Sequence, residues 1–108
     1  MDDVLKGLYE VVLERRDHPQ ESSYTCYLFE QGLDKILKKC GEECSEVIIA
    51  AKNTNNDETA EEICDLLYHL LVMMAQQDIP LEQIKSILEF RRQKIGNLKK
   101  FHESDHNT

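Results

Sequence analysis

The chain has 108 residues, a formal net charge of −8 at pH 7, and few helix breakers, with four Gly and two Pro. This length suits one domain with a modest core. The negative charge argues against a protein that coats DNA or RNA, because such binding neutralises phosphates with Lys and Arg. A phosphate ligand remains compatible with the charge if a divalent cation reverses the local field.

Apolar residues at helical spacing predict a first helix from Val4 to about Arg16. The start of the chain has neither the basic residues nor the apolar stretch of a signal peptide, and no apolar run approaches the ~18 residues of a membrane span. We therefore expect a cytoplasmic protein without membrane contact. The stretch His18 to Thr25 lacks helical periodicity and contains Pro19, which predicts a loop with Tyr24 in it.

A longer apolar pattern predicts a second helix over about residues 32–52, with a stripe centred near Cys44 and Ala51. Cys40 and Cys44 lie one turn apart on this stripe and could in principle hold a metal. We interpret them instead as buried small hydrophobic residues. The four cysteines show neither the CxxC spacing of zinc ribbons nor the density of a disulfide scaffold.

The polar turn of residues 53–57 contains Asn and Asp side chains that can cap a third helix, over about residues 58–76. Apolar residues surround most of this helix, which predicts burial on several sides. Because four short helices would leave part of it uncovered, we expect some of its apolar residues to contact another subunit. These are Leu67, Leu71, Val72 and Met74. Pro80 suits the first turn of a fourth helix, from Leu81 to about Lys94.

These patterns predict an all-α fold, because helix-favouring residues are abundant and β-branched residues are sparse. We expect one domain over residues 1–95, a four- to five-helix bundle completed by a homodimer or a larger homo-oligomer. Residues 96–108 are polar and are predicted to form a flexible tail.

Acidic residues recur on two successive predicted helices. At roughly 100° per residue, Glu43 and Glu46 share a strip beside the apolar stripe of the second helix, while Glu42 points further toward solvent. Glu62 and Asp65 share a strip on the third helix. An acidic pair at this spacing is also common on solvated helix faces, so the first pair alone would not indicate a site.

The apolar neighbours of Asp65 make the second pair more informative. An unpaired carboxylate between Ile63 and Leu67 would cost several kcal/mol in lost hydration unless a cation offset it. Like charges on two helices also repel each other. Mg²⁺ suits such a site, because it prefers carboxylate oxygens and keeps exchangeable waters, and Mn²⁺ is a possible substitute. The predicted metal ligands are Glu43, Glu46, Glu62 and Asp65.

A di-iron carboxylate bundle is the competing kind of metal site. Such bundles use a Glu-x-x-His motif, whereas the residue three positions after Glu62 is Asp65. His69 is therefore expected to support a ligand from behind or to pack in the core.

Four residues are candidates for substrate binding. Lys35 and Lys39 lie nearest the acidic strip of the second helix and could contact phosphates, or could form an ordinary solvated edge. Arg91 is a candidate second anion contact, although any helix C-terminus favours cations. Tyr24 could stack on a base or ribose, or could pack against the core.

Several segments together resemble the phosphoribosyl-ATP pyrophosphohydrolase family, over roughly Leu8 to Arg92. They are Ser23-Tyr24-Thr25, Leu28-Phe29, Gly32, Asp34 to Lys39, Gly41-Glu42-Glu43, Glu46, Glu62 and Asp65 to Leu71. The acidic residues alone would indicate only the wider superfamily of all-α nucleotide pyrophosphatases, which includes MazG-like enzymes and dimeric dUTPases.

The resemblance implies an oligomeric helical enzyme of histidine biosynthesis, which converts phosphoribosyl-ATP and water into phosphoribosyl-AMP and pyrophosphate. It carries the metal-ligand role to Glu43, Glu46, Glu62 and Asp65, with Glu42 as a weaker candidate. We expect Glu43 or Glu46 to orient or deprotonate the attacking water, while Lys35 and Lys39 share the phosphate charge.

Two other functions stay open at the level of sequence. A house-cleaning pyrophosphatase of the same superfamily would hydrolyse noncanonical nucleoside triphosphates. A non-enzymatic helical module would use its acidic strip to bind a basic partner, and metal ions would not stabilise it.

Overall fold

A computed structural model describes residues 2–95, which form five α-helices and no β-strand. The helices are α1 (Asp2–Asp17), α2 (Tyr24–Gln31), α3 (Leu33–Lys52), α4 (Asn56–Gln76) and α5 (Leu81–Ile95). The prediction of an all-α fold is therefore confirmed. The polar tail predicted for residues 96–108 lies outside the described residues.

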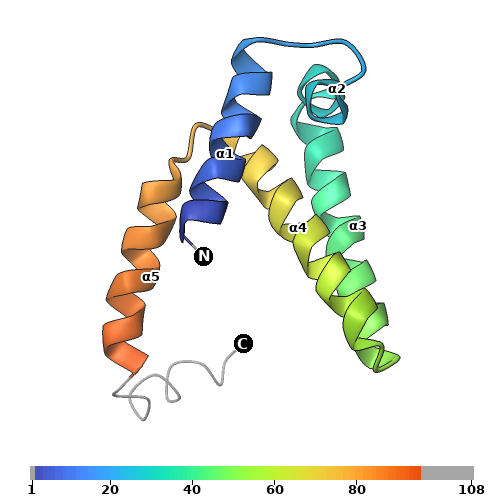
Figure 1. Cartoon of the computed structure of the whole chain (residues 1–108), viewed down its shortest axis with the longest axis vertical. Helices are drawn as coiled ribbons and strands as arrows, with labels where there is room; N and C mark the ends of the chain where they lie inside the picture. Colours follow the sequence, from blue (N-terminus) through green and yellow to red (C-terminus); the bar gives the residue numbers. More distant parts are fainter. Residues whose placement is uncertain (1, 96–108) are drawn as a thin grey trace.

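Helices α3 and α4 form a long hairpin that makes the most extensive helix contact in the described chain (Figure 1). Asn55 closes the turn between them, because its side-chain oxygen accepts a hydrogen bond of 3.1 Å from the backbone N–H of Glu58. This cap lets α4 begin at Asn56, two residues before the predicted start. The hairpin sets the acidic residues of α3 against those of α4.

Helix α2 was not predicted, and the prediction that Tyr24 and Thr25 belong to a loop is wrong. Ser23 caps the helix by accepting a 3.1 Å hydrogen bond from the backbone N–H of Cys26. The helix ends at Gly32, whose φ of 93° is a conformation that side chains with a Cβ rarely adopt. Figure 1 shows α2 almost end-on beside the start of α3, so the chain turns sharply at this glycine.

The core lies where α1, α2, α3 and α4 meet. Its most buried large side chains are Val12, Leu28, Ile36 and Val72, one from each of these helices. Tyr9 of α1 also donates a 2.7 Å hydrogen bond to the carbonyl oxygen of Ile79, just before α5. The C-terminal half of α4 is therefore enclosed within a single chain.

The prediction that apolar residues of α4 contact another subunit is wrong for most of the residues named. Leu71, Val72 and Met74 are buried inside the chain, and Leu67 is partly buried. The prediction assumed four helices, and the additional short helix α2 covers part of α4. Leu71, Val72 and Met74 therefore cannot form the surface of an interface.

The inward face of α3 also differs from the predicted stripe. Cys44 and Ala51 are exposed, whereas Ile36 and Ala50 are buried. The apolar residues of α3 cover a wider arc than the face that contacts α4. The predicted centre of this arc, near Cys44 and Ala51, therefore lies beside the contact and not within it. Cys40 is half-buried, and burial raises the pKa of its thiol, whereas the expectation of burial is wrong for Cys44.

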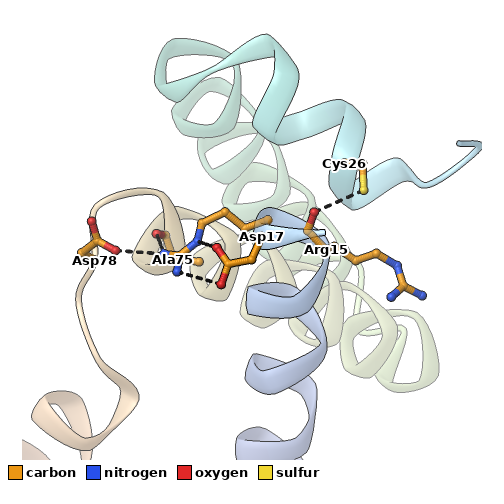
Figure 2. Close-up of polar contacts among 6 residues, drawn as sticks. Arg15, Asp17, Cys26, Ala75 and Asp78 are labelled. Atoms are coloured by element: carbon orange, nitrogen blue, oxygen red, sulfur yellow. Dashed lines mark hydrogen bonds and ion pairs between the residues drawn. The ribbon is translucent and has the colours of Figure 1, made fainter. Parts of the chain in front are cut away.

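Arg16 joins the end of α1 to the turn between α4 and α5. Its guanidinium donates hydrogen bonds of 2.8 Å to the carbonyl oxygen of Ala75 and 2.9 Å to a carboxylate oxygen of Asp78. Figure 2 shows Asp17, Ala75 and Asp78 gathered around this group, while Arg15 points away. Helix α5 then extends on the far side of α1 from α3 (Figure 1). None of the helices within residues 2–95 combines the length and apolar character needed to cross a membrane.

Candidate metal centre and nucleotide site

Three carboxylates converge across the α3–α4 hairpin. One oxygen atom from each of Glu43, Glu62 and Asp65 lies within 4.8 Å of the other two. Glu43 comes from the middle of α3, and the other two residues are spaced i,i+3 on α4. Hard carboxylate oxygens this close together are a donor set that suits a divalent cation such as Mg²⁺.

The choice of Glu43 over Glu42 agrees with the geometry of α3. The side chain of Glu43 is 14% exposed, whereas that of Glu42 is 49% exposed. Glu43 therefore faces the hairpin, and Glu42 lies at the solvent side of the same helix.

The carboxylates of the cluster repel one another, and the effect is resolved at Glu62. Burial and the negative charges of Asp65, Glu46, Glu43 and Glu58 raise the pKa of the Glu62 carboxyl. Each of these charges makes ionisation of Glu62 less favourable. The cluster is thus an anionic site in which a bound cation would relieve mutual repulsion.

Asp65 is not buried, contrary to the prediction from its apolar neighbours. Asp65 is exposed, as are its neighbours Ile63 and Cys64. Lost hydration in a single chain therefore gives no reason to expect a cation beside Asp65. The negative charge of Asp65 instead acts on Glu62, whose pKa it raises.

Glu46 lies one turn after Glu43 on α3 and is exposed. Its charge acts on Glu62, but among the described residues it is not part of the set whose oxygens lie within 4.8 Å of one another. The structure thus brings three of the predicted metal ligands together and leaves the fourth at the edge of the cluster.

Lys39 is the cation of α3 beside this cluster. Its ammonium nitrogen lies 3.3 Å from a carboxylate oxygen of Glu42 and 3.7 Å from one of Glu43. Burial lowers the pKa of Lys39, but the hydrogen bond to Glu42 and the charges of Tyr24, Glu42 and Glu43 outweigh burial and raise it. Lys39 is therefore held as a cation at the rim of the acidic cluster.

The two other predicted anion contacts have different positions. Lys35 lies one turn before Lys39 on α3 and is partly buried. Arg91 is exposed on α5, which lies across α1 from α3 (Figure 1). A single chain therefore brings Lys39 to the carboxylates and keeps Arg91 away from them.

Two successive residues of α2 bond to two successive residues of α4. The Tyr24 hydroxyl lies 3.1 Å from Nε2 of His69, and the Thr25 hydroxyl forms a hydrogen bond with that of Tyr68. The Tyr24 ring also meets the His69 ring edge to face, with centroids 5.8 Å apart. The sequence placed Tyr24 and His69 in separate motifs, and their pairing was missed because α2 was not expected.

Comparison with known proteins agrees with this architecture. Residues 5–92 match the family described as phosphoribosyl-ATP pyrophosphohydrolase. The chain belongs to this family. It is 55% identical to the phosphoribosyl-ATP pyrophosphatase of Clostridium novyi over 97 residues, covering 90% of this chain and 88% of the relative.

Two further relatives with the same name extend the comparison to other bacteria. The Listeria innocua protein is 60% identical over 93 residues, covering 86% of this chain and 89% of the relative. The Streptococcus sanguinis protein is 47% identical over 103 residues, covering 95% and 99%. In this member of the phosphoribosyl-ATP pyrophosphohydrolase family, the matched span includes the acidic cluster, Lys39, Tyr24 and His69.

Proposed function

We propose that this chain hydrolyses phosphoribosyl-ATP to phosphoribosyl-AMP and pyrophosphate in histidine biosynthesis. Its family and its relatives are named for this reaction, which places the chain among hydrolases that act on a phosphoanhydride. The observation that supports a nucleotide-hydrolysing site most directly is the convergence of Glu43, Glu62 and Asp65 across the α3–α4 hairpin.

We further propose that Glu43, Glu62 and Asp65 hold Mg²⁺, or Mn²⁺ in its place, with Glu46 as an additional ligand from the edge of the cluster. The all-oxygen donor set and the raised pKa of Glu62 support this assignment. When bound, the ion would neutralise charge on the phosphate oxygens and on the leaving pyrophosphate. No protein nucleophile is needed for such a reaction.

Most of the remaining roles fall to side chains of α3. Lys39 is suited to a substrate phosphate, because it is a cation at the rim of the cluster, and Lys35 would extend this basic edge. Glu46 or Glu43 would orient the attacking water or accept its proton. Within one chain, α5 lies across α1 from α3 (Figure 1), so Arg91 would contact a substrate phosphate only from another copy of the chain.

The test of the metal site replaces one ligand without changing its shape. The Asp65→Asn variant should lose metal-dependent pyrophosphate release while its circular dichroism spectrum stays unchanged. Glu61→Gln removes one negative charge from an exposed position of the same helix and should keep full activity. Full activity of Asp65→Asn would remove Asp65 from the site.

Substrate profiling tests the identity of the substrate separately. We expect turnover of phosphoribosyl-ATP and little hydrolysis of dUTP or other free nucleoside triphosphates. Efficient turnover of free triphosphates, with none of phosphoribosyl-ATP, would favour a house-cleaning pyrophosphatase. A lack of stabilisation by Mg²⁺ and Mn²⁺ would instead favour a non-enzymatic module.

We also propose that the chain forms a homodimer or a larger homo-oligomer in the cytoplasm. The α3–α4 hairpin exposes apolar side chains that a second copy would cover, among them Leu37, Ile48 and Ile63, which are 42%, 63% and 43% exposed. Sedimentation at micromolar concentration should give at least twice the chain mass. Ile48→Asp should lower that mass, whereas Val4→Asp, at an exposed position of α1, should not. A monomeric wild-type protein would contradict the proposal.

A further inference from the structure

His69 is held by two hydrogen bonds that face in opposite directions. Its Nδ1 lies 2.7 Å from the backbone carbonyl oxygen of Asp65, and its Nε2 lies 3.1 Å from the Tyr24 hydroxyl. His69 is 5% exposed. His69 and Asp65 both belong to α4, so the first bond holds the orientation of the ring on its own helix, and the second ties the ring to α2.

These contacts determine which atoms donate. A carbonyl oxygen can only accept, so Nδ1 of His69 carries the proton and donates to Asp65. In the neutral ring Nε2 then has a free lone pair and accepts the hydrogen of the Tyr24 hydroxyl. The Tyr24 oxygen is left with lone pairs but no hydrogen for any other partner.

Tyr24 is 46% exposed, and it lies close enough to Lys39, Glu42 and Glu43 for their charges to act on its hydroxyl. Burial raises the pKa of its hydroxyl, and the charges of Lys39 and Glu43 both act on it. A hydroxyl that can only accept would repel phosphate oxygens. It would instead receive a hydrogen bond from a donor, and the substrate donors nearest the phosphate chain are ribose hydroxyls.

We propose that His69 is a positioning residue that turns the Tyr24 hydroxyl into a hydrogen-bond acceptor for a ribose hydroxyl of the nucleotide. This inference rests on the proposed function for its substrate. Because His69 belongs to the helix that carries Glu62 and Asp65, its bond to Tyr24 also sets where the ribose contact lies relative to the metal-binding carboxylates. Recognition of the sugar and placement of the phosphates are thereby coupled through one buried ring.

Two replacements of His69 separate the two bonds that it makes. Asn can imitate Nδ1, so His69→Asn keeps a donor for Asp65 but loses the acceptor for Tyr24. Gln can imitate Nε2, so His69→Gln keeps an acceptor for Tyr24. We expect His69→Asn and Tyr24→Phe each to raise KM about five- to tenfold with kcat nearly unchanged, and His69→Gln to restore most of the loss.

The double variant and substrate analogues extend this test. Tyr24→Phe combined with His69→Asn should be no worse than either single change, because both remove the same bond. Phosphoribosyl-ATP analogues that lack the 2′- or the 3′-hydroxyl of the adenosine ribose should bind wild-type enzyme several-fold more weakly. For one of these analogues, the Tyr24→Phe variant should bind the analogue and phosphoribosyl-ATP equally well. Multiplicative effects, or a loss of kcat and of metal-dependent stabilisation in His69→Asn, would overturn the proposal in favour of a structural role.

A measurement independent of turnover decides the state of His69. Nitrogen-15 NMR of the imidazole at about pH 8, above the ordinary pKa of His, should show the Nδ1–H tautomer in the wild-type protein. The Nε2–H tautomer would overturn the positioning role. Absence of phosphoribosyl-ATP turnover by wild-type protein would defeat the proposed function, and the tautomer would still decide whether His69 orients Tyr24.

Discussion

The ammonium nitrogen of Lys39 lies 3.7 Å from a carboxylate oxygen of Glu43, one turn along α3. This pair places a cation directly beside the carboxylate that faces α4. A phosphate held between Lys39 and a metal bound at the cluster would meet positive charge on both sides. The contact therefore predicts a role for Lys39 in binding the substrate and none in binding the metal.

Replacing Lys39 by Met should raise KM for phosphoribosyl-ATP about tenfold, because one charge-assisted hydrogen bond is lost. Metal affinity should stay the same or increase, since a neighbouring positive charge is removed. Steady-state kinetics and a Mg²⁺ titration measure the two effects. Lys38→Met is the matched control, since Lys38 is exposed on the same helix and should leave KM unchanged. Equal KM values for both variants would contradict the role of Lys39.

Glu62 gives a prediction about stability and pH. Its pKa in the folded protein is raised above the ordinary value of 4.5, so the folded state holds the proton more tightly than the unfolded state. Stability of the metal-free protein is therefore lost as the pH rises from about 4.5 through the folded pKa. Glu62→Gln removes this loss, and the metal-free variant should be more stable than wild type at pH 7.

Thermal unfolding in EDTA, from about pH 4 to pH 8, measures this effect. The advantage of Glu62→Gln should vanish below about pH 4.5, where Glu62 is protonated in both states. Mg²⁺ should stabilise wild type more than the variant. Glu61→Gln, at an exposed position of α4, should show neither change. A metal-free Glu62→Gln protein that is less stable than wild type at pH 7 would show that repulsion does not dominate at this position.

The sequence predicted the helical fold and the acidic residues because both follow from local periodicity. Helical spacing correctly predicted that Glu43 lies beside the apolar face of its helix and that Glu42 lies nearer to solvent. Burial in three dimensions was harder to predict, as Asp65 and Cys44 show, since both are exposed although apolar residues flank Asp65 and lie one turn from Cys44. Which part of an apolar arc is covered depends on the neighbouring helices, and local spacing does not contain that information.

The missed helix α2 had a readable signal in its cap. Ser23 precedes a short run, Tyr24 to Gln31, that ends at Gly32, and both flanking residues are typical of helix ends. The polar residues before Ser23 obscured this start. Because α2 was absent from the prediction, its two bonds to Tyr68 and His69 could not be foreseen.

The cap of α2 gives a prediction that links stability to function. Ser23→Ala should lower the free energy of unfolding by ~1 kcal/mol, because the backbone N–H of Cys26 loses its acceptor. The kcat/KM value should also fall, since the same helix carries Tyr24. Ser23→Asp, which can also cap, should recover most of both losses. Ser86→Ala, at an exposed helical position, should change neither quantity. Unaltered stability of Ser23→Ala would exclude the cap as a determinant of α2.

Arg16 allows the neutral and the charged contacts of one guanidinium to be compared. Its partner Asp78 is 83% exposed, so solvent screens their ion pair and its contribution should be below ~0.5 kcal/mol. The bond to the Ala75 carbonyl is part-buried, and a cation there also faces the C-terminal end of α4. Arg16→Gln should therefore lower the free energy of unfolding by ~1–2 kcal/mol, more than Asp78→Asn does.

Chemical denaturation of the Arg16 and Asp78 variants, with Arg15→Gln as control, measures this difference. The Arg15 side chain points away from the turn in Figure 2, and its carbonyl oxygen, which accepts a bond from Cys26, is kept in the variant. Arg15→Gln should therefore be close to wild type. Added salt should reduce the small cost of Asp78→Asn and leave most of the cost of Arg16→Gln, because a hydrogen bond to a carbonyl is screened less than an exposed ion pair. Equal, salt-sensitive costs for Arg16→Gln and Asp78→Asn would mean that the ion pair, and not the bond to the Ala75 carbonyl, accounts for the contribution of Arg16.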